Sequence, residues 1–309
     1  DFISMYLPDK LNLPSENDTR EFFNPPLPYI FPSIIQIICR NVLNSNDIMR
    51  SCQPIYGLYT QIFQGLLYLA SIFFYSKIFK EIRNDKKYLD FSLLIFISLL
   101  TVNYKTFAMI RGEPYIVFFN SIILYRFYKL CSDSFKYSKK DILIFGLMIG
   151  FLALSRQWAF LLFPAYFLLT FFIENREEKL NYFKFLIYSF FIGFCISSWF
   201  YFGLFIEYGS FTAFNKEPVT FDFKNQPLSF YIPFGNEILY VFSKPIRPYF
   251  SNQFLPILYS DLWGDYWGYF KFTSKNLSLG KNQLLVGDYL ARVNIVSIIP
   301  SIIMLLGIS

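Results

Sequence analysis

The sequence predicts an all-α membrane protein, a polytopic bundle of helices, on three observations. Of its 309 residues, 54% are hydrophobic and only 16% are charged, with a mean hydropathy of +0.37, whereas soluble domains carry about 25% charged residues. The 41 Phe and 24 Tyr residues present more aromatic surface than one soluble core buries. The apolar residues also fall into long runs, and a membrane-spanning helix needs about 20 mostly apolar residues.

These runs divide the chain into a transmembrane domain, 1–206, and a large loop, 207–290. A first loop, 1–54, precedes six expected spans, which are 55–79, 89–110, 114–130, 141–155, 158–174 and 185–206. A further span begins at 291–309 and is cut off. Because the chain starts with Asp and stops inside an apolar run, we expect it to be a fragment of a longer protein.

The basic residues orient the spans, because cytoplasmic connections carry an excess of Lys and Arg. Thirteen basic residues lie in the connections 77–88, 126–140 and 174–184. Only four lie in the connections 44–54, 103–114 and 155–158. The first set is therefore expected inside and the second set outside, together with the loop 207–290.

Residues 27–43 follow Asn24-Pro25-Pro26-Leu27-Pro28-Tyr29, where two prolines without N–H donors let a helix begin but not pass through. The start 1–26 holds two basic and five acidic residues, which fits the outer side. With 44–54 also outside, 27–43 does not cross. We expect a re-entrant or interfacial helix whose polar face carries Ser33, Gln36 and Arg40, with a spanning helix as the alternative.

Charged residues end several apolar runs on the expected outer side. Lys105 alone is compatible with simple snorkelling toward water. Arg111 and Glu113 either form a local ion pair that holds a turn or belong to a site. Arg156 interrupts an otherwise apolar hairpin, where a cation is costly without an anionic partner, so we expect it to bind an anion.

The outer loop contains Tyr259-Ser260-Asp261-Leu262-Trp263-Gly264-Asp265-Tyr266-Trp267-Gly268-Tyr269-Phe270, which holds two of the four tryptophans. An interfacial aromatic belt is one interpretation. A carbohydrate or lipid-headgroup platform is the other, and it accounts better for the aspartates and glycines. In that case Trp263 and Trp267 stack on sugar rings while Asp261 and Asp265 accept hydroxyl hydrogen bonds.

Other site classes are excluded or unsupported. The sequence has no histidine, which excludes a Ser-His-Asp triad and removes the commonest metal ligand. The four cysteines have no CxxC spacing and indicate neither a zinc site nor a disulfide framework, so we expect core or lipid-facing thiols. No metal or other cofactor is expected, although a divalent metal stays open. The net charge of +6 reflects membrane topology, and no nucleic-acid partner is expected.

These outer-side groups suit group transfer from a phosphate-linked donor. A carboxylate takes the proton of an acceptor hydroxyl, and Arg or Lys stabilises the charge that develops on the leaving phosphate. Because nucleotide donors are cytoplasmic, an outer site points to a lipid-linked donor.

In order along the chain, the motifs resemble the GT-C superfamily of integral-membrane glycosyltransferases, in particular the protein O-mannosyltransferase and aminoarabinose transferase branch of family 39 type. The Pro-Pro-Leu element at Asn24 to Tyr29 is similar to one that opens a helix at the membrane surface in that branch, with Asn where relatives often have His or Lys. Arg111 with Glu113, the helix from Gly146 ending at Arg156, and the Asp-Leu-Trp-Gly-Asp-Tyr-Trp run resemble later motifs.

The resemblance implies a role for each candidate residue. The catalytic base of the family is an acidic residue in the first outer loop, and Asp1 is the first choice here. The weaker choices are Asp9, Glu16, Asp18 and Glu21, and a residue upstream of this sequence is a further choice. The donor phosphate would contact Arg111, Arg156 and Lys105. Substrate-binding residues would be Asn24, Tyr29, Glu113, Asp261, Trp263, Asp265 and Trp267.

The sequence therefore predicts an inverting glycosyltransferase of the plasma (inner) membrane, with its active site on the outer or periplasmic face. Its partners would be a polyprenyl-phosphate-linked sugar, a lipid, glycan or protein acceptor, and membrane lipids. An outer-face polysaccharide polymerase or ligase is an alternative, although the loop 207–290 has seven basic and seven acidic residues and no histidine. A transporter is the non-enzymatic alternative, although no internal repeat is evident.

Overall fold

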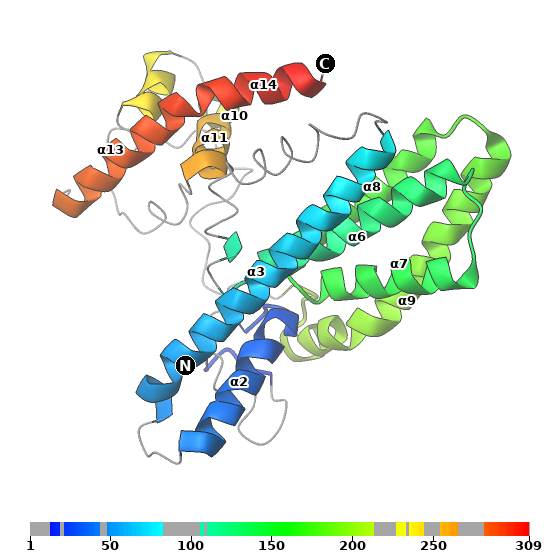
Figure 1. The fold of residues 1–309 in the computed structure, drawn as a ribbon, viewed down its shortest axis with the longest axis horizontal. Helices are drawn as coiled ribbons and strands as arrows, with labels where there is room; N and C mark the ends of the chain where they lie inside the picture. Colours follow the sequence, from blue (N-terminus) through cyan, green and yellow to red (C-terminus); the bar gives the residue numbers. More distant parts are fainter. Residues whose placement is uncertain are drawn as a thin grey trace. The chain divides into compact units, whose positions relative to one another are not determined.

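The structure is a computed structural model that describes residues 13–18, 22–43, 48–82, 106–107, 110–212, 227–232, 235–243, 254–264 and 281–308. Helices make up most of these described residues, which contain no strand (Figure 1). The chain divides into two compact units: the first unit is residues 1–94 with 106–218, and the second unit is residues 95–105 with 219–309.

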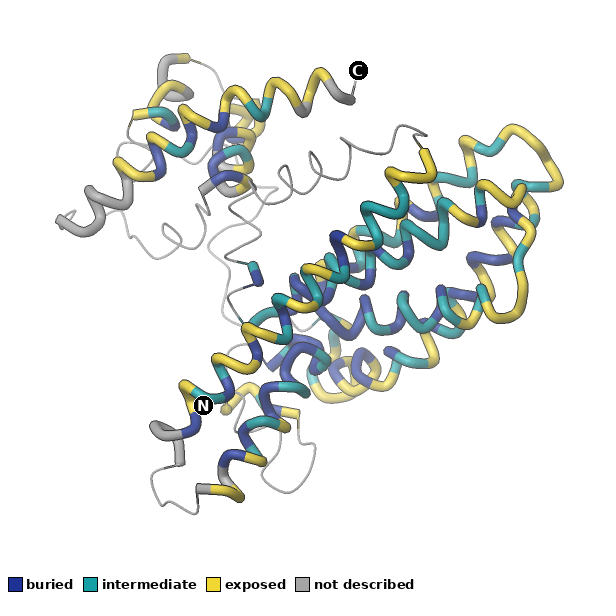
Figure 2. Tube along the Cα trace, viewed as in Figure 1, coloured by how far each residue is buried: buried dark blue, intermediate teal, exposed yellow. Residues whose placement is uncertain are grey.

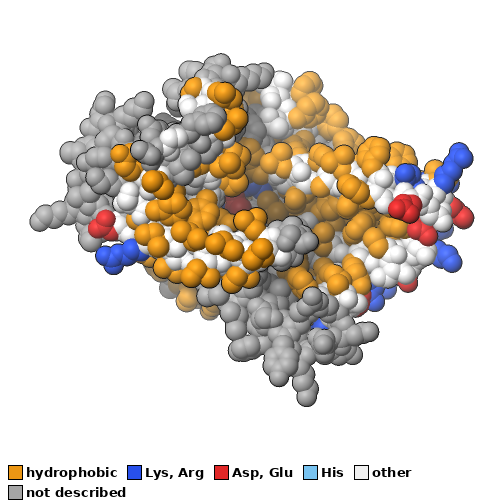
Figure 3. All heavy atoms as spheres, turned by 90° about the horizontal axis from the view of Figure 1, so that it is seen from above, with side chains coloured by type: hydrophobic (Ala, Val, Ile, Leu, Met, Phe, Trp, Pro, Cys, Tyr) orange, Lys and Arg blue, Asp and Glu red, His pale blue; other side chains and the backbone are white. Residues whose placement is uncertain are grey.

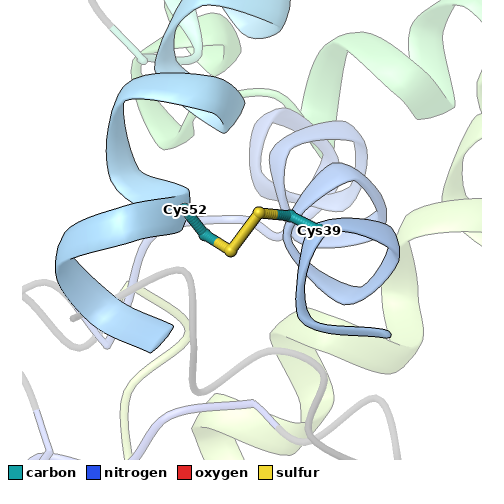
Figure 4. Close-up of a disulfide and its surroundings, with 2 residues drawn as sticks. All are labelled: Cys39 and Cys52. Carbon is teal, nitrogen blue, oxygen red and sulfur yellow. A yellow bond between two sulfur atoms is a disulfide. The ribbon is translucent and has the colours of Figure 1, made fainter. Parts of the chain in front are cut away.

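Helices α2 (Leu27–Leu43) and α3 (Ile48–Ile82) lie side by side in the first unit (Figure 1). The Phe31 and Phe63 rings stack with their centroids 4.3 Å apart, and a disulfide joins Cys39 to Cys52 nearer the connection between the helices (Figure 4). The two helices are therefore antiparallel. The expectation of four unpaired thiols is wrong for this pair, because the antiparallel packing brings two cysteines 13 residues apart in sequence to a Cα–Cα distance of 5.9 Å.

Helix α2 places its polar residues against the protein and its apolar residues outward. Ser33 and Gln36 are buried, whereas Ile34 and Ile38 are about half exposed. The Ser33 hydroxyl donates to the Tyr29 carbonyl oxygen at 2.6 Å. Residues 27–43 form one continuous helix that does not turn back on itself. Such an arrangement is typical of a helix whose outer surroundings are apolar.

The structure describes four further helical stretches of the first unit. They are α6 (Glu113–Ser132), α7 (Lys139–Ala153), the short helices η1 (Gln157–Leu162), α8 (Phe163–Leu168) and η2 (Leu169–Phe172), and α9 (Arg176–Tyr208). Polar caps mark the helix starts: Ser138 and Asp141 form a capping box at α7, and the Asn175 side chain accepts from two backbone N–H groups of α9. Helix α9 ends at Gly209, whose φ of 69° is in the left-handed region.

Helices α7 and α9 approach closely at glycines. A Cβ on Gly146 would come within 2.7 Å of Ile192, and one on Gly150 within 2.8 Å of Ile196. From the other side, a Cβ on Gly193 would meet Ile149 at 2.7 Å. The spacing of Gly146 and Gly150 is the small-xxx-small pattern that lets membrane helices pack backbone to backbone.

Within the part of the chain that the structure describes, two helices are long and apolar enough to span a membrane: residues Cys52–Ile82 of α3 and Arg176–Tyr208 of α9. Exposed positions run along one side of each helix (Figure 2), and they include the apolar residues Leu58, Leu66 and Leu69 of α3 and Phe191 and Ile206 of α9. On the side that it buries, α3 carries Thr60, Gln64 and Ser71, so its polar residues face the protein and its apolar residues face outward, as in a helix with apolar surroundings.

Charged residues gather where α3 and α6 end and α7 begins (Figure 3). Lys129 pairs with Glu81 at 3.7 Å, and Arg126 pairs with Asp141 at 3.6 Å. These residues belong to, or adjoin, the connections that the charge count places inside. The structure thus brings two of the three basic connections to one end of the first unit, which we call the basic end.

The second unit contains α10 (Leu228–Tyr231), η4 (Asn236–Phe242), α11 (Phe254–Gly264), α13 (Lys281–Val296) and α14 (Ile298–Ile308). A buried polar network joins η4, α11 and α13. The Asn294 side-chain amide donates to the Val241 carbonyl oxygen at 2.8 Å and to Ser260 Oγ at 2.7 Å. The Tyr259 hydroxyl donates to the Asn294 carbonyl oxygen at 2.6 Å. Helices therefore occupy part of the stretch 207–290 that the sequence predicted as a loop.

Candidate functional site

The Pro-Pro element is anchored to the C-terminal end of α7, opposite the basic end. Pro25 and Pro26 have no N–H groups, so Leu27 provides the first donor of α2, and it donates to the Leu154 carbonyl oxygen at 3.2 Å. The Gln157 side-chain amide donates to the Phe23 carbonyl oxygen at 2.8 Å. Two hydrogen bonds thus hold the predicted start of α2 on the hairpin that carries Arg156.

A second predicted segment reaches the same place through Gly112. A Cβ on Gly112 would overlap the Ser155 carbonyl oxygen and come within 3.0 Å of the Arg156 Cβ. Only glycine permits this approach, which puts the start of α6 directly against the end of α7. Arg111, Glu113 and Arg156 are therefore neighbours, although more than 40 positions separate Arg156 from the other two in the sequence. We call the end of the first unit that carries residues 22–27, 110–113 and 154–157 the site end.

The ion pair at the site end joins two helix starts. Arg156 Nε lies 3.2 Å from Glu113 Oε1, with side-chain exposures of 20% and 35%. Glu113 is in the first turn of α6, where the helix dipole favours a negative charge. The alternative of a local pair between Arg111 and Glu113 is wrong, because the carboxylate pairs with Arg156 across the hairpin contact.

Several buried polar atoms at or next to the site end have no hydrogen-bond partner among the residues that the structure describes. They include Glu113 Oε2, Tyr115 Oη and Gln157 Oε1. Leaving such atoms unpaired costs about 1–3 kcal/mol each. The site end thus retains hydrogen-bonding capacity that a polar ligand could satisfy.

The described residues 22–27, 110–113 and 154–157 of the site end carry a net charge of +1. Arg156 and Glu113 offset one another, and Arg111 is half-buried, with no ion pair to another residue that the structure describes. One positive charge therefore remains beside the first turn of α6, where the positive end of the helix dipole also favours an anion. This combination can bind a phosphate or another anion of a substrate.

Gln157 is a residue of this site that sequence reasoning did not select. Its amide nitrogen donates to Phe23 as above and also to the Thr212 carbonyl oxygen at 2.8 Å, so it ties three segments together. The signal in the sequence was weak, because one polar residue beside Arg156 looks like an ordinary hairpin tip.

Asn24 and Tyr29 reach the site end but are buried, with exposures of 4% and 5%. Tyr29 packs with Tyr56, against Ile35 and Ile110. Their burial suits residues that hold the segment in place better than residues that face a ligand. Their expected role in substrate binding stays a prediction.

Trp263 is likewise buried, in the second unit, with an exposure of 4%. Its indole N–H donates to Ser301 Oγ at 3.0 Å, which ties α11 to α14. A buried indole has no free face for a sugar ring, so this geometry favours a packing role. Asp261 lies in α11, and its side chain is outside the described residues, as are all of Asp1, Lys105, Asp265 and Trp267.

Among the weaker choices for the base, Asp18 is described. Its carboxylate accepts from the Ser15 backbone N–H at 2.9 Å and from the Ser15 hydroxyl at 2.8 Å. These bonds lower the pKa of Asp18, the backbone bond having the larger effect. Because a lower pKa weakens a general base, Asp18 is a poorer choice than the sequence alone suggested.

In the part of the chain that the structure describes, no group of three or more His, Cys, Asp or Glu side chains is placed to hold a metal ion. Comparison with known protein families, with curated proteins and with solved structures finds no match to this chain. A function for it therefore has to be reasoned from its own residues.

Proposed function

We propose that this chain is part of a GT-C-type glycosyltransferase that moves a sugar from a polyprenyl-phosphate donor to an acceptor hydroxyl at the outer face of the plasma membrane. The acceptor would be a lipid, a glycan or a protein. The observation that carries the proposal is the grouping of Arg111, Arg156 and Glu113 with the Pro-Pro element at the site end.

Two features support an outer location for the site end. The site end lies opposite the basic end, and connections rich in Lys and Arg stay in the cytoplasm. The Cys39–Cys52 disulfide joins α2, which starts at the site end, to α3. Disulfides form and persist in oxidising compartments, which for an inner-membrane protein means the outer side. Nucleotide-linked donors are absent there, which leaves a lipid-linked sugar.

The chemistry assigns one role to each group. Arg111, and Arg156 held by Glu113, would stabilise the negative charge that grows on the departing polyprenyl phosphate. The acceptor hydroxyl would give its proton to a carboxylate of the first outer loop, for which Asp1 is our first choice. The sugar then forms its new bond as the bond to phosphate breaks, with inversion at the anomeric carbon.

The test uses the full-length protein in membranes with undecaprenyl-phosphate-linked radiolabelled hexoses and pentoses as probes. Release of undecaprenyl phosphate and transfer of label into lipid, glycan and protein fractions are measured together. We expect Arg111→Gln and Arg156→Gln each to reduce transfer by about 10²–10³-fold, the usual effect of losing one charge-stabilising donor. Lys136→Gln, at the basic end, is the matched control and should retain full transfer.

Glu113→Gln separates loss of charge from loss of structure, because it breaks the ion pair but keeps both arginines. We expect it to reduce transfer less than Arg156→Gln does. Full transfer in both arginine variants would refute the assignment. Uptake of a labelled solute without any glycosyl transfer would favour a transporter instead.

A further inference from the structure

The first unit contains a groove separate from the site end, formed between α7, the η1 and α8 turns, and α9. Its volume is about 320 Å³. Ala153, Phe160, Phe163, Phe190, Phe194 and Phe202 contribute to its lining, and none of the lining residues is charged. The groove is therefore suited to an apolar occupant.

The groove opens sideways through the outer face of α9. Phe194, Phe202 and Phe211 line it and are also exposed, by 54%, 44% and 47% of their surfaces. The opening is thus continuous with the apolar face of α9 that carries Phe191 and Ile206. If α9 spans the membrane, the opening faces lipid tails rather than water.

The length of the groove identifies which hydrocarbon would fit. Along α9 its lining extends from Phe190 to Phe202, which is about 18 Å at the helical rise of 1.5 Å per residue. One leaflet is half of a hydrocarbon core about 30 Å thick, or roughly 15 Å. All of the α9 lining residues except Phe190 lie in the second half of α9, which ends toward the site end, so the groove matches the depth of the outer leaflet.

We propose that this groove binds one acyl chain of an outer-leaflet phospholipid. An apolar void with no occupant forfeits dispersion contacts along its whole lining, and a lipid tail restores them. The match to one leaflet favours a phospholipid tail over a polyprenyl chain, which is much longer. This inference requires that α9 is embedded in the membrane with the site end outward, and it does not depend on glycosyl transfer.

The experiment reconstitutes the full-length protein in phosphatidylcholine vesicles that contain a small fraction of lipid with a diazirine midway along one acyl chain. After irradiation, the labelled residues are mapped by peptide mass spectrometry. Phe171 and Phe191 are exposed outside the groove and report ordinary contact with bulk lipid. We expect about ten times more adducts on Phe160, Phe163 and Phe194 than on these two residues, because a bound acyl chain stays beside the groove residues.

A variant pair tests the groove itself. Ser198 is part of the lining, and Ser198→Trp should fill the groove and lower its labelling about tenfold. Ile206→Trp adds the same indole to an 83% exposed position on the same helix and should leave the labelling unchanged.

Three outcomes would overturn the proposal. The first is equal labelling, in the wild-type protein, of the groove residues and of the exposed residues Phe171 and Phe191. The second is unchanged groove labelling in a folded Ser198→Trp protein. The third is displacement of the label by equimolar undecaprenyl phosphate, which would make the occupant an isoprenoid chain.

Discussion

Removing the disulfide tests how firmly α2 is held against α3. The Cys39–Cys52 bridge closes a loop of 13 residues. Closing a loop of that length stabilises the folded state by about 3 kcal/mol, because the bridge restricts the conformational entropy of the unfolded chain. Both cysteines are buried, at 6% and 1% exposure, so Cys39→Ser with Cys52→Ser removes the bridge with little change of volume.

Amide hydrogen exchange measures this loss of stability directly in α2. In the double variant we expect the amides of α2 to exchange about 100-fold faster, since each 1.4 kcal/mol is a factor of ten. Treating the wild-type protein with dithiothreitol should have the same effect without any substitution. Amides of α7 should keep their rates, because α7 contacts α6 and α9 rather than the bridge.

The matched control is Cys131→Ser with Cys195→Ser, which removes the two free thiols and leaves the bridge. Its α2 amides should exchange as in the wild type. The reasoning is refuted if the bridge variant and the reduced wild-type protein exchange their α2 amides within twofold of the oxidised protein.

Two substitutions and one control substitution test the packing behind the site end, each measured by thermal unfolding in detergent. Gly112→Ala should destabilise the protein by about 1–3 kcal/mol, because the added Cβ would overlap the Ser155 carbonyl oxygen. The control, Gly203→Ala, meets no atom within 4 Å and should stabilise the protein by about 0.5–1 kcal/mol. Equal melting temperatures of the two variants would contradict this prediction. Tyr201→Phe should cost about 1 kcal/mol, since the Tyr201 hydroxyl donates to the Ala153 carbonyl oxygen at 2.6 Å, and an unchanged melting temperature would show that this bond contributes nothing.

The sequence predicted the helical class and several helices within a few residues. The expected span 114–130 corresponds to Glu113–Ser132, and 141–155 to Lys139–Ala153. The span 185–206 begins earlier, at Arg176, because Asn175 caps a polar first turn that hydropathy does not detect. The span 158–174 is three short helical turns rather than one helix.

The grouping of Arg111, Glu113 and Arg156 was predicted only as a shared side of the membrane. Their actual pairing depends on Gly112 touching Ser155, a contact between distant segments that no local pattern encodes. The disulfide was missed for the same reason, since the spacing of two cysteines does not reveal antiparallel helices. Burial of Trp263 also depends on tertiary packing, here against Ser301.

The central claim is that the site end faces outward and the basic end faces the cytoplasm. The direct measurement labels single cysteines in intact cells with a membrane-impermeant maleimide, in the Cys131→Ser, Cys195→Ser background. Glu207→Cys reports the exposed last turn of α9 toward the site end, and Lys136→Cys reports an exposed position at the basic end. We predict immediate labelling of the first and labelling of the second only after permeabilisation; the reverse pattern would contradict the orientation and the outer-face site with it.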